Sequence, residues 1–166
     1  MGKNVAIFTL LVGIAVALWS CSSTGCIENK SSIPLAGFYD SKSKKSVKIS
    51  GVNINGVGSE AFLLSSSESS TQVYLPLRSR QRVTSFCFNY ATDTITGAQL
   101  NDTITIEYEA EPHFVSEECG AMYYYKINAL RYTQIMIDSV KLEENLITNT
   151  DIERVKIYFR VEESVE

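Results

Sequence analysis

Apolar and polar residues alternate along much of this chain with a period of two. Thr103–Glu109 (TITIEYE) places two isoleucines and a tyrosine on one face and threonines and glutamates on the other. Val155–Val161 (VKIYFRV) repeats the pattern with four apolar residues on one face. Such alternation is typical of β-strands that bury one side, and segments of helical period are hard to find. The sequence therefore predicts an all-β protein.

Further segments with strand character are separated by connectors rich in serine, glycine, asparagine and aspartate, such as NGVGSE and SSSESS. These candidate strands are Ile33–Tyr39, Val47–Ile54, Val73–Arg78, Arg82–Tyr90, Met122–Ile127 and Gln134–Leu142. About eight short strands joined by such turns are typical of an antiparallel sandwich or a small barrel. We expect a single antiparallel, immunoglobulin-like β-sandwich over residues 33–166.

The N-terminus has the pattern of a secretory signal peptide. Lys3 precedes an apolar run from Val5 to Leu18, with small residues ahead of the break that follows it. A helix that spans a bilayer needs about 20 apolar residues, and this run is shorter. We expect residues 1–20 to be a targeting segment that is removed.

Residues 18–21 (LWSC) resemble the bacterial lipobox, in which the cysteine is acylated and becomes the new N-terminus. The bulky Trp19 departs from the usual small residue at its position. The resemblance implies lipid attachment at Cys21, with residues 21–32 as anchor and tether. Two or three acyl chains hold a soluble domain firmly at a membrane. The alternative is cleavage by the ordinary signal peptidase, which leaves Cys21 free or in a disulfide.

Charge narrows the range of partners. The net charge is −4 for all 166 residues and becomes −5 without residues 1–20, which hold one lysine and no acid. Binding to phosphate backbones needs a basic surface, so an acidic body argues against nucleic acid as a partner. It also argues against adsorption to anionic lipid head groups, which leaves the anchoring to the acyl chains.

Lipidation of Cys21 leaves three cysteines, which permit one disulfide in an oxidising compartment. Cys87 lies within the strand pattern RVTSFCFNY, whereas Cys119 precedes a turn glycine and Cys26 follows the anchor. Two cysteines in loops approach each other more readily than one in a loop and one in mid-strand. We therefore expect a Cys26–Cys119 bridge, with Cys87 as a small buried residue. Cys21 and Cys26 are separated by at most roughly 17 Å of chain, so the bridge is expected to hold the body close to the membrane.

Residues that could carry catalysis or bind metal are sparse. His113 is the single histidine, no G-x-S-x-G or G-x-x-x-x-G-K motif is present, and the cysteines are scattered. Glu107, Glu109 and Glu111 share one face of a strand, which suits either a carboxylate site or a solvated face. We favour the solvated face, expect no enzyme activity, cofactor or metal, and interpret His113 as a surface residue.

The run Tyr123–Tyr125 is the best sequence argument for ligand binding, because tyrosines stack on sugars while their hydroxyls stay hydrated. Consecutive strand residues point to opposite faces, so Tyr124 is expected to point away from its neighbours. Tyr123 and Tyr125 are thus the candidate ligand contacts. Ordinary sheet packing is the competing interpretation, and we favour it.

Several segments together resemble a known family. The lipobox and the nearby Cys26 are followed by IPLAGFYD, DTITIEYE, FVSEECGAMYYYKI and a closing RVKIYFRV. The pattern is similar to a family of small lipoproteins from anaerobic Gram-negative bacteria whose domain has no known function. The resemblance supports the pairing of Cys26 with Cys119 and implies no activity.

The sorting information agrees with an outer-membrane protein. Ser22 follows the acylated cysteine, and neither an aspartate that resembles a retention signal nor an acidic export run is present. We expect a lipoprotein of the outer membrane that faces the periplasm. Its leading function is that of a structural or protein-interaction module, and the alternative is a glycan- or small-ligand-binding lipoprotein that uses its tyrosines.

Overall fold

The computed structural model describes residues 31–90, 100–117 and 120–161, which form twelve β-strands and no helix. The strands are β1 (Leu35–Asp40), β2 (Ile49–Ser50), β3 (Val52–Gly56), β4 (Phe62–Leu64), β5 (Ser69–Ser70), β6 (Gln72–Tyr74), β7 (Val83–Tyr90), β8 (Asn101–Ser116), β9 (Gly120–Tyr132), β10 (Ile137–Leu142), β11 (Leu146–Ile147) and β12 (Glu153–Phe159). The all-β prediction is confirmed. The expected number of strands was too low, because alternation cannot reveal strands of only two or three residues, such as β4, β5 and β11. Gly51, with a φ of +72°, also divides the expected strand Val47–Ile54 into β2 and β3.

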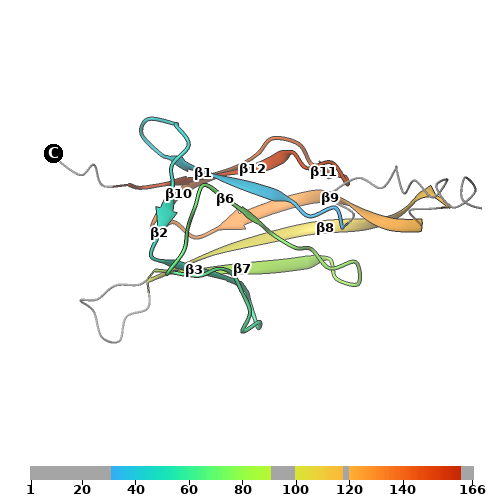
Figure 1. The fold of residues 1–166 in the computed structure, drawn as a ribbon, viewed down its shortest axis with the longest axis horizontal. Helices are drawn as coiled ribbons and strands as arrows, with labels where there is room; N and C mark the ends of the chain where they lie inside the picture. Colours follow the sequence, from blue (N-terminus) through green and yellow to red (C-terminus); the bar gives the residue numbers. More distant parts are fainter. Residues whose placement is uncertain (1–30, 91–99, 118–119, 162–166) are drawn as a thin grey trace, which may run out of the picture.

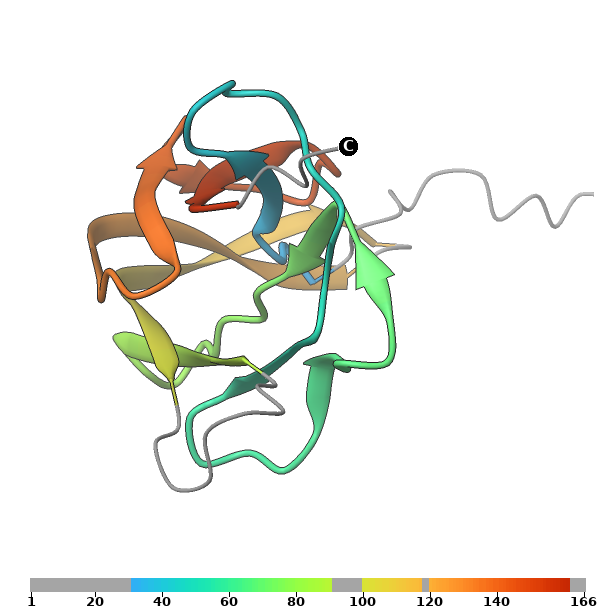
Figure 2. The same cartoon turned by 90° about the vertical axis from the view of Figure 1, so that its left-hand side faces the viewer.

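Two larger sheets and one small sheet make up the body (Figures 1 and 2). The four-stranded sheet has the order β10-β12-β1-β6, and the curled six-stranded antiparallel sheet has the order β11-β9-β8-β7-β3-β4. Strands β2 and β5 form the small third sheet.

The first and last strands, β1 and β12, pair in parallel. The prediction of a purely antiparallel arrangement is therefore wrong at this pair. Alternation determines which face of a strand is buried, but it does not determine the direction of a neighbour that is distant in sequence. The immunoglobulin-like connectivity stays a prediction.

A continuous core joins the two larger sheets. Ile104, Ile106 and Tyr108 of β8 are buried, as their alternation predicts, and so are Val155 and Ile157 of β12. The rings of Phe88 on β7 and Phe159 on β12 lie 6.4 Å apart and connect the sheets. The residues that complete the buried cluster are Ala36, Phe38, Val52, Ile54, Leu64, Val73, Leu75, Phe86, Tyr125, Ile127, Ile137 and Ile147.

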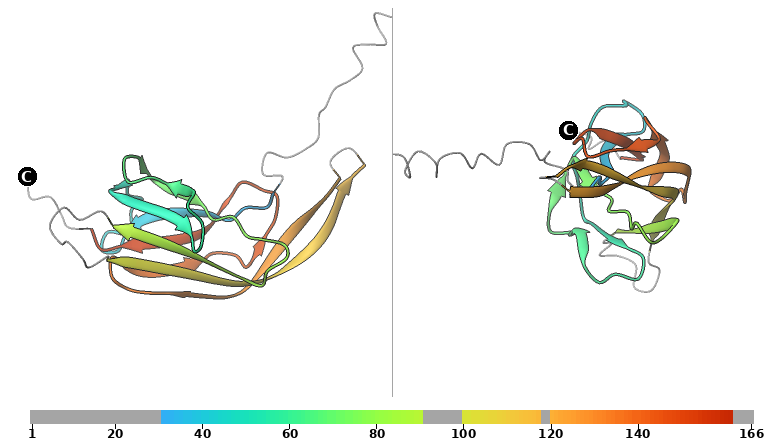
Figure 3. Two further views of the ribbon diagram at one scale, coloured as in Figure 1. Left: turned by 90° about the horizontal axis from the view of Figure 1, so that it is seen from below. Right: turned by 90° about the vertical axis from the view of Figure 1, so that its right-hand side faces the viewer.

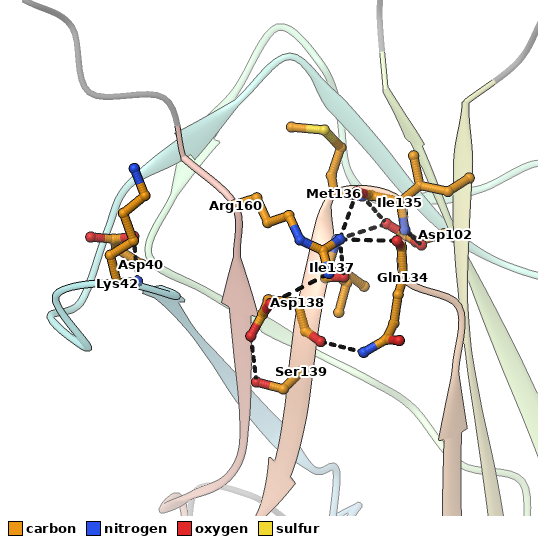
Figure 4. Close-up of polar contacts among 10 residues, drawn as sticks. All are labelled: Asp40, Lys42, Asp102, Gln134, Ile135, Met136, Ile137, Asp138, Ser139 and Arg160. Atoms are coloured by element: carbon orange, nitrogen blue, oxygen red, sulfur yellow. Dashed lines mark hydrogen bonds and ion pairs between the residues drawn. The ribbon is translucent and has the colours of Figure 1, made fainter.

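The link from β9 to β10, which crosses from one sheet to the other, is fixed by the buried carboxylate of Asp102. Figure 4 shows this carboxylate facing the backbone of residues 135–137. One oxygen, Oδ1, accepts hydrogen bonds from the Ile135 amide and the Thr133 hydroxyl, both at 2.8 Å. The other, Oδ2, accepts from the amides of Met136 (2.7 Å) and Ile137 (2.8 Å) and from the Tyr90 hydroxyl (2.9 Å).

These hydrogen bonds decide the charge of Asp102. Burial alone would raise the pKa of the carboxyl, but the amides of Ile135, Ile137 and Met136 and the Thr133 hydroxyl outweigh it and lower the pKa. The side chain is therefore an anion inside the protein, held by backbone donors.

The other side of the same link is held by Arg160, which follows β12. Its Nη1 donates to the carbonyl oxygens of Gln134 and Ile135, each at 2.9 Å, and of Ile137 at 3.1 Å (Figure 4). Its Nη2 lies 3.4 Å from a carboxylate oxygen of Asp138. Asp102 and Arg160 thus satisfy the amides and the carbonyls of one crossover between the sheets.

Strands β8 and β9 continue beyond the body as a two-stranded hairpin. Strand β7 pairs with β8 over Asn101–Glu107, and β11 pairs with β9 only at Tyr125 and Lys126. Beyond these points β8 and β9 pair with each other, and Figure 3 shows them curving away from the rest of the fold. We call Glu109–Ser116 together with Gly120–Tyr124 the arm.

Candidate functional site

The strand face that is buried within the body of the protein is exposed to solvent in the arm. The register places Ala110 opposite Tyr125, Pro112 opposite Tyr123 and Phe114 opposite Ala121. The exposed fraction of the side chains rises along this face, from 5% at Tyr125 to 44% at Tyr123 and 66% at Phe114. The arm therefore presents apolar side chains that the fold itself does not cover.

A groove of about 390 Å³ lies between the base of this face and the body. The body side consists of Ser31, Ile33, Pro76 and Leu77, and the β9 side consists of Ala121, Met122, Tyr123 and Tyr125. The side chain of Ser32 is buried, and its hydroxyl lies 3.9 Å from the Met122 sulfur. The first residues that the structure describes thus lie against β9.

The two candidate ligand-contact tyrosines both line this groove but differ in exposure. The ring of Tyr125 packs edge-on against Tyr108 at 5.4 Å, and its hydroxyl donates to the Leu77 carbonyl at 3.5 Å. Burial raises the pKa of Tyr125. Tyr125 is thus a core residue with its edge at the groove, whereas Tyr123 is open to solvent. Their role in binding stays a prediction.

The opposite face of the arm is polar. Tyr124 points there, as the alternation predicts: its ring stacks on His113 at 4.2 Å, and its hydroxyl donates to Asn149 Oδ1 at 3.0 Å. His113, Glu109 and Glu111 are exposed, so the expected surface role of His113 and the solvated acidic face agree with the structure. Glu107, at the base of this face, pairs with Arg131 at 2.6 Å.

Cys87 lies on β7 opposite the face that buries Phe86 and Phe88, as predicted, but it is half-buried rather than buried. Its thiol donates to Asn89 Oδ1 at 3.4 Å. Burial raises the pKa of the thiol more than this hydrogen bond lowers it. Such a cysteine is less reactive than an exposed one near neutral pH.

The predicted lipid attachment at Cys21 and the Cys26–Cys119 bridge lie outside the described residues. The neighbours of Cys119 are described, however: Ser116 ends β8 and Gly120 begins β9.

No cluster of three or more potential metal ligands occurs within residues 31–90, 100–117 and 120–161. In the same ranges there is also no helix long and apolar enough to cross a membrane. The features that distinguish this part of the chain are the arm and its groove.

The fold and this site define an all-β protein with a projecting two-stranded arm. Comparison with family models adds a particular assignment: residues 47–159 match the Family of unknown function (DUF6452), so the chain belongs to that family. A search of curated proteins and a search of solved structures each found no match. The expected membership in a family of unknown function is confirmed; lipidation and a bacterial envelope origin stay predictions.

Sequence reasoning missed the exposed apolar face of the arm, chiefly Phe114. A signal was present, because the alternation of Ile104, Ile106 and Tyr108 continues through Ala110, Pro112 and Phe114. Period-two alternation predicts that these residues share a face. It does not reveal that the neighbouring strands end first and leave the face open.

Proposed function

We propose that this protein is a non-catalytic, lipid-anchored module of the cell envelope whose arm is its contact surface for another protein. The observation that carries the proposal is the exposure of Phe114 and Tyr123 on an apolar strand face outside the core. Scattered surface hydrophobic residues are ordinary, but a contiguous apolar face suggests an interaction site. Aromatic side chains are also enriched at protein interfaces.

The proposed anchor gives the arm a second role. Lipid at Cys21 and a Cys26–Cys119 bridge would hold the outer end of the arm, rather than the body, near the membrane. From Tyr108 to Ser116 a strand extends about 26 Å, at roughly 3.3 Å per residue. The arm would then act as a stiff spacer between the lipid and the body, which we interpret as a β-sandwich because its two larger sheets share one core.

Site-specific photo-crosslinking in cells tests the protein-contact proposal. A benzophenone amino acid in place of Phe114 should crosslink to one or a few defined partner proteins. We expect these partners at the periplasmic face of the outer membrane, where the proposed anchor would hold the protein. The matched control is the same substitution at Phe62, which is 56% exposed but lies on β4, away from the arm. Equal capture at both positions, or none at Phe114, would refute the proposal.

The anchor and the bridge have their own test. The intact mass of the native protein should show acyl chains and the loss of residues 1–20, and it should rise by two hydrogens on reduction of one disulfide. A mass equal to that of the polypeptide without lipid would refute the proposed anchor. A free thiol at Cys26 would refute the proposed disulfide bridge.

The groove supports a second candidate function, the binding of a glycan or another small ligand. Tyr123 is exposed beside a groove of about 390 Å³, and tyrosine rings suit stacking on sugars. A glycan array should then give hits that Tyr123→Ala abolishes and Phe62→Ala leaves unchanged. An array without such hits would eliminate this function.

A further inference from the structure

A second groove lies at the end of the fold away from the arm, where β7 and β12 end (Figure 1). Its volume is about 390 Å³. Its deepest lining residues, Val52 and Phe159, are 2% and 4% exposed and belong to the core. The half-buried side chains of Val47 and Ile49 and the exposed side chain of Met136 form further apolar parts of its lining. The groove therefore leads from solvent to the core along apolar side chains.

The size of this groove matches a single hydrocarbon chain. Small-molecule sites in proteins usually have volumes of roughly 300–1,000 Å³, and this groove falls within that range. One water molecule takes about 30 Å³ of the liquid, and a methylene group is of similar size, so the groove holds about a dozen non-hydrogen atoms. One acyl chain of roughly ten carbons fits this space, whereas the two long chains of a membrane phospholipid do not.

The mouth of the groove is basic, although the chain as a whole is acidic. Residues 41–59 contain four lysines and no aspartate or glutamate, against a net charge of −4 for the whole chain. One of these lysines, Lys48, is exposed and lines the groove. None of the ion pairs among the described residues involves it. Arg160 also lines the groove, but its guanidinium already contacts three carbonyl oxygens and Asp138. Lys48 is therefore the cation that an anionic ligand can reach.

We propose that this groove binds a fatty acid of medium length, a single acyl chain with a carboxylate at one end. The chain lies against Val47, Ile49 and Met136 with its far end at Phe159, and the carboxylate lies beside Lys48. Apolar walls with a few placed polar groups are the usual form of a small-molecule site. Burial of the chain supplies most of the affinity, and the ammonium group is a point charge that orients the ligand. The site depends neither on the arm nor on the proposed anchor.

Photo-affinity labelling of the native protein tests this site, with phosphatidylcholine nanodiscs present to hold any attached lipid. The probe is decanoic acid that carries a diazirine in the far half of its chain. We expect label on the peptides that contain Val47–Val52 and Met136, and we expect excess decanoate to suppress it. Decyltrimethylammonium has the same chain length but a positive head group, and it should suppress the label less well by roughly fivefold or more. Label confined to other peptides, or equal suppression by the two amphiphiles, would overturn the proposal.

Three variants test the two parts of the site separately. Lys48→Gln should raise the decanoate concentration for half-suppression about twofold to fivefold and leave that of uncharged decanol unchanged. Lys126→Gln is the matched control, because Lys126 is exposed on β9 outside the groove, and it should change neither value. Met136→Ser keeps the amide that donates to Asp102 and should weaken both ligands about fourfold, the effect of one buried methylene group.

The variants also state what would contradict each assignment. If Lys48→Gln has no effect, or weakens decanoate and decanol equally, the carboxylate does not lie beside Lys48 and the proposal is overturned. If Met136→Ser leaves both ligands unchanged, the acyl chain does not lie in this groove.

Discussion

Substitution of Asp102 by alanine is the sharpest test of how the crossover between the sheets is held. The carboxylate accepts three backbone N–H groups, from Ile135, Met136 and Ile137, at 2.7–2.8 Å. The Ile137 amide is buried, and a buried donor that loses its partner costs about 1–3 kcal/mol. The amides of Ile135 and Met136 belong to partly exposed residues, so each lost hydrogen bond there costs about 0.5–1.5 kcal/mol. The three together predict a loss of about 2–6 kcal/mol in the free energy of unfolding, a large share of the roughly 5–15 kcal/mol typical of a domain. The two hydroxyl donors are left out because they can rotate to other partners.

Urea denaturation measures this loss, with the native disulfide intact and the slope m compared between variants. Asp138→Asn is the matched control: this half-exposed aspartate lies in the same cluster but accepts no hydrogen bond from these three amides, which bind Asp102, and it contacts Arg160 only at 3.4 Å. We expect it to cost less than about 1 kcal/mol. A loss below about 1 kcal/mol for Asp102→Ala would refute the argument that the carboxylate fixes the link.

The same residue predicts a pH dependence. The hydrogen bonds lower the pKa of Asp102 in the folded protein, so its contribution to stability is complete above the ordinary aspartate value of about 3.9. It is lost as the pH falls through the lower folded pKa. Asp102→Asn should therefore weaken the acid-induced decline in stability below about pH 4, measured as urea midpoints at each pH. An unchanged decline would contradict the assignment.

Three further predictions follow from burial and hydrogen bonding. Tyr125→Ala should cost about 3–5 kcal/mol in urea denaturation and Tyr123→Ala less than about 1 kcal/mol; equal losses would contradict their assignment to core and surface. Arg160→Lys retains the charge but loses the planar fork that reaches three carbonyls, and should cost about 1–2 kcal/mol in the same assay. The Cys87 thiol, whose pKa burial raises, should react with iodoacetamide at pH 8 several-fold more slowly in the native than in the unfolded chain; equal rates by mass mapping would contradict this.

Much of the strand content was predictable because a strand that buries one face must alternate. Ile104 and Ile106, like Val155 and Ile157, point into the core as their spacing indicates. The opposite orientation of Tyr124 and the exposure of His113 follow from the same rule. Short connectors with glycine and serine also marked most of the turns.

The sequence by itself determined the all-β class, the buried face of each long strand and the acidic character of the chain, since these depend on local periodicity and composition. Only the tertiary structure decided that β1 pairs in parallel with β12 and that β8 and β9 extend beyond the strands beside them. It also decided that Asp102 accepts hydrogen bonds from the amides of a link more than thirty residues away. These features depend on which segments meet across long sequence separations. Period-two alternation contains no information about such meetings, because it is satisfied equally well by many pairings of the same strands.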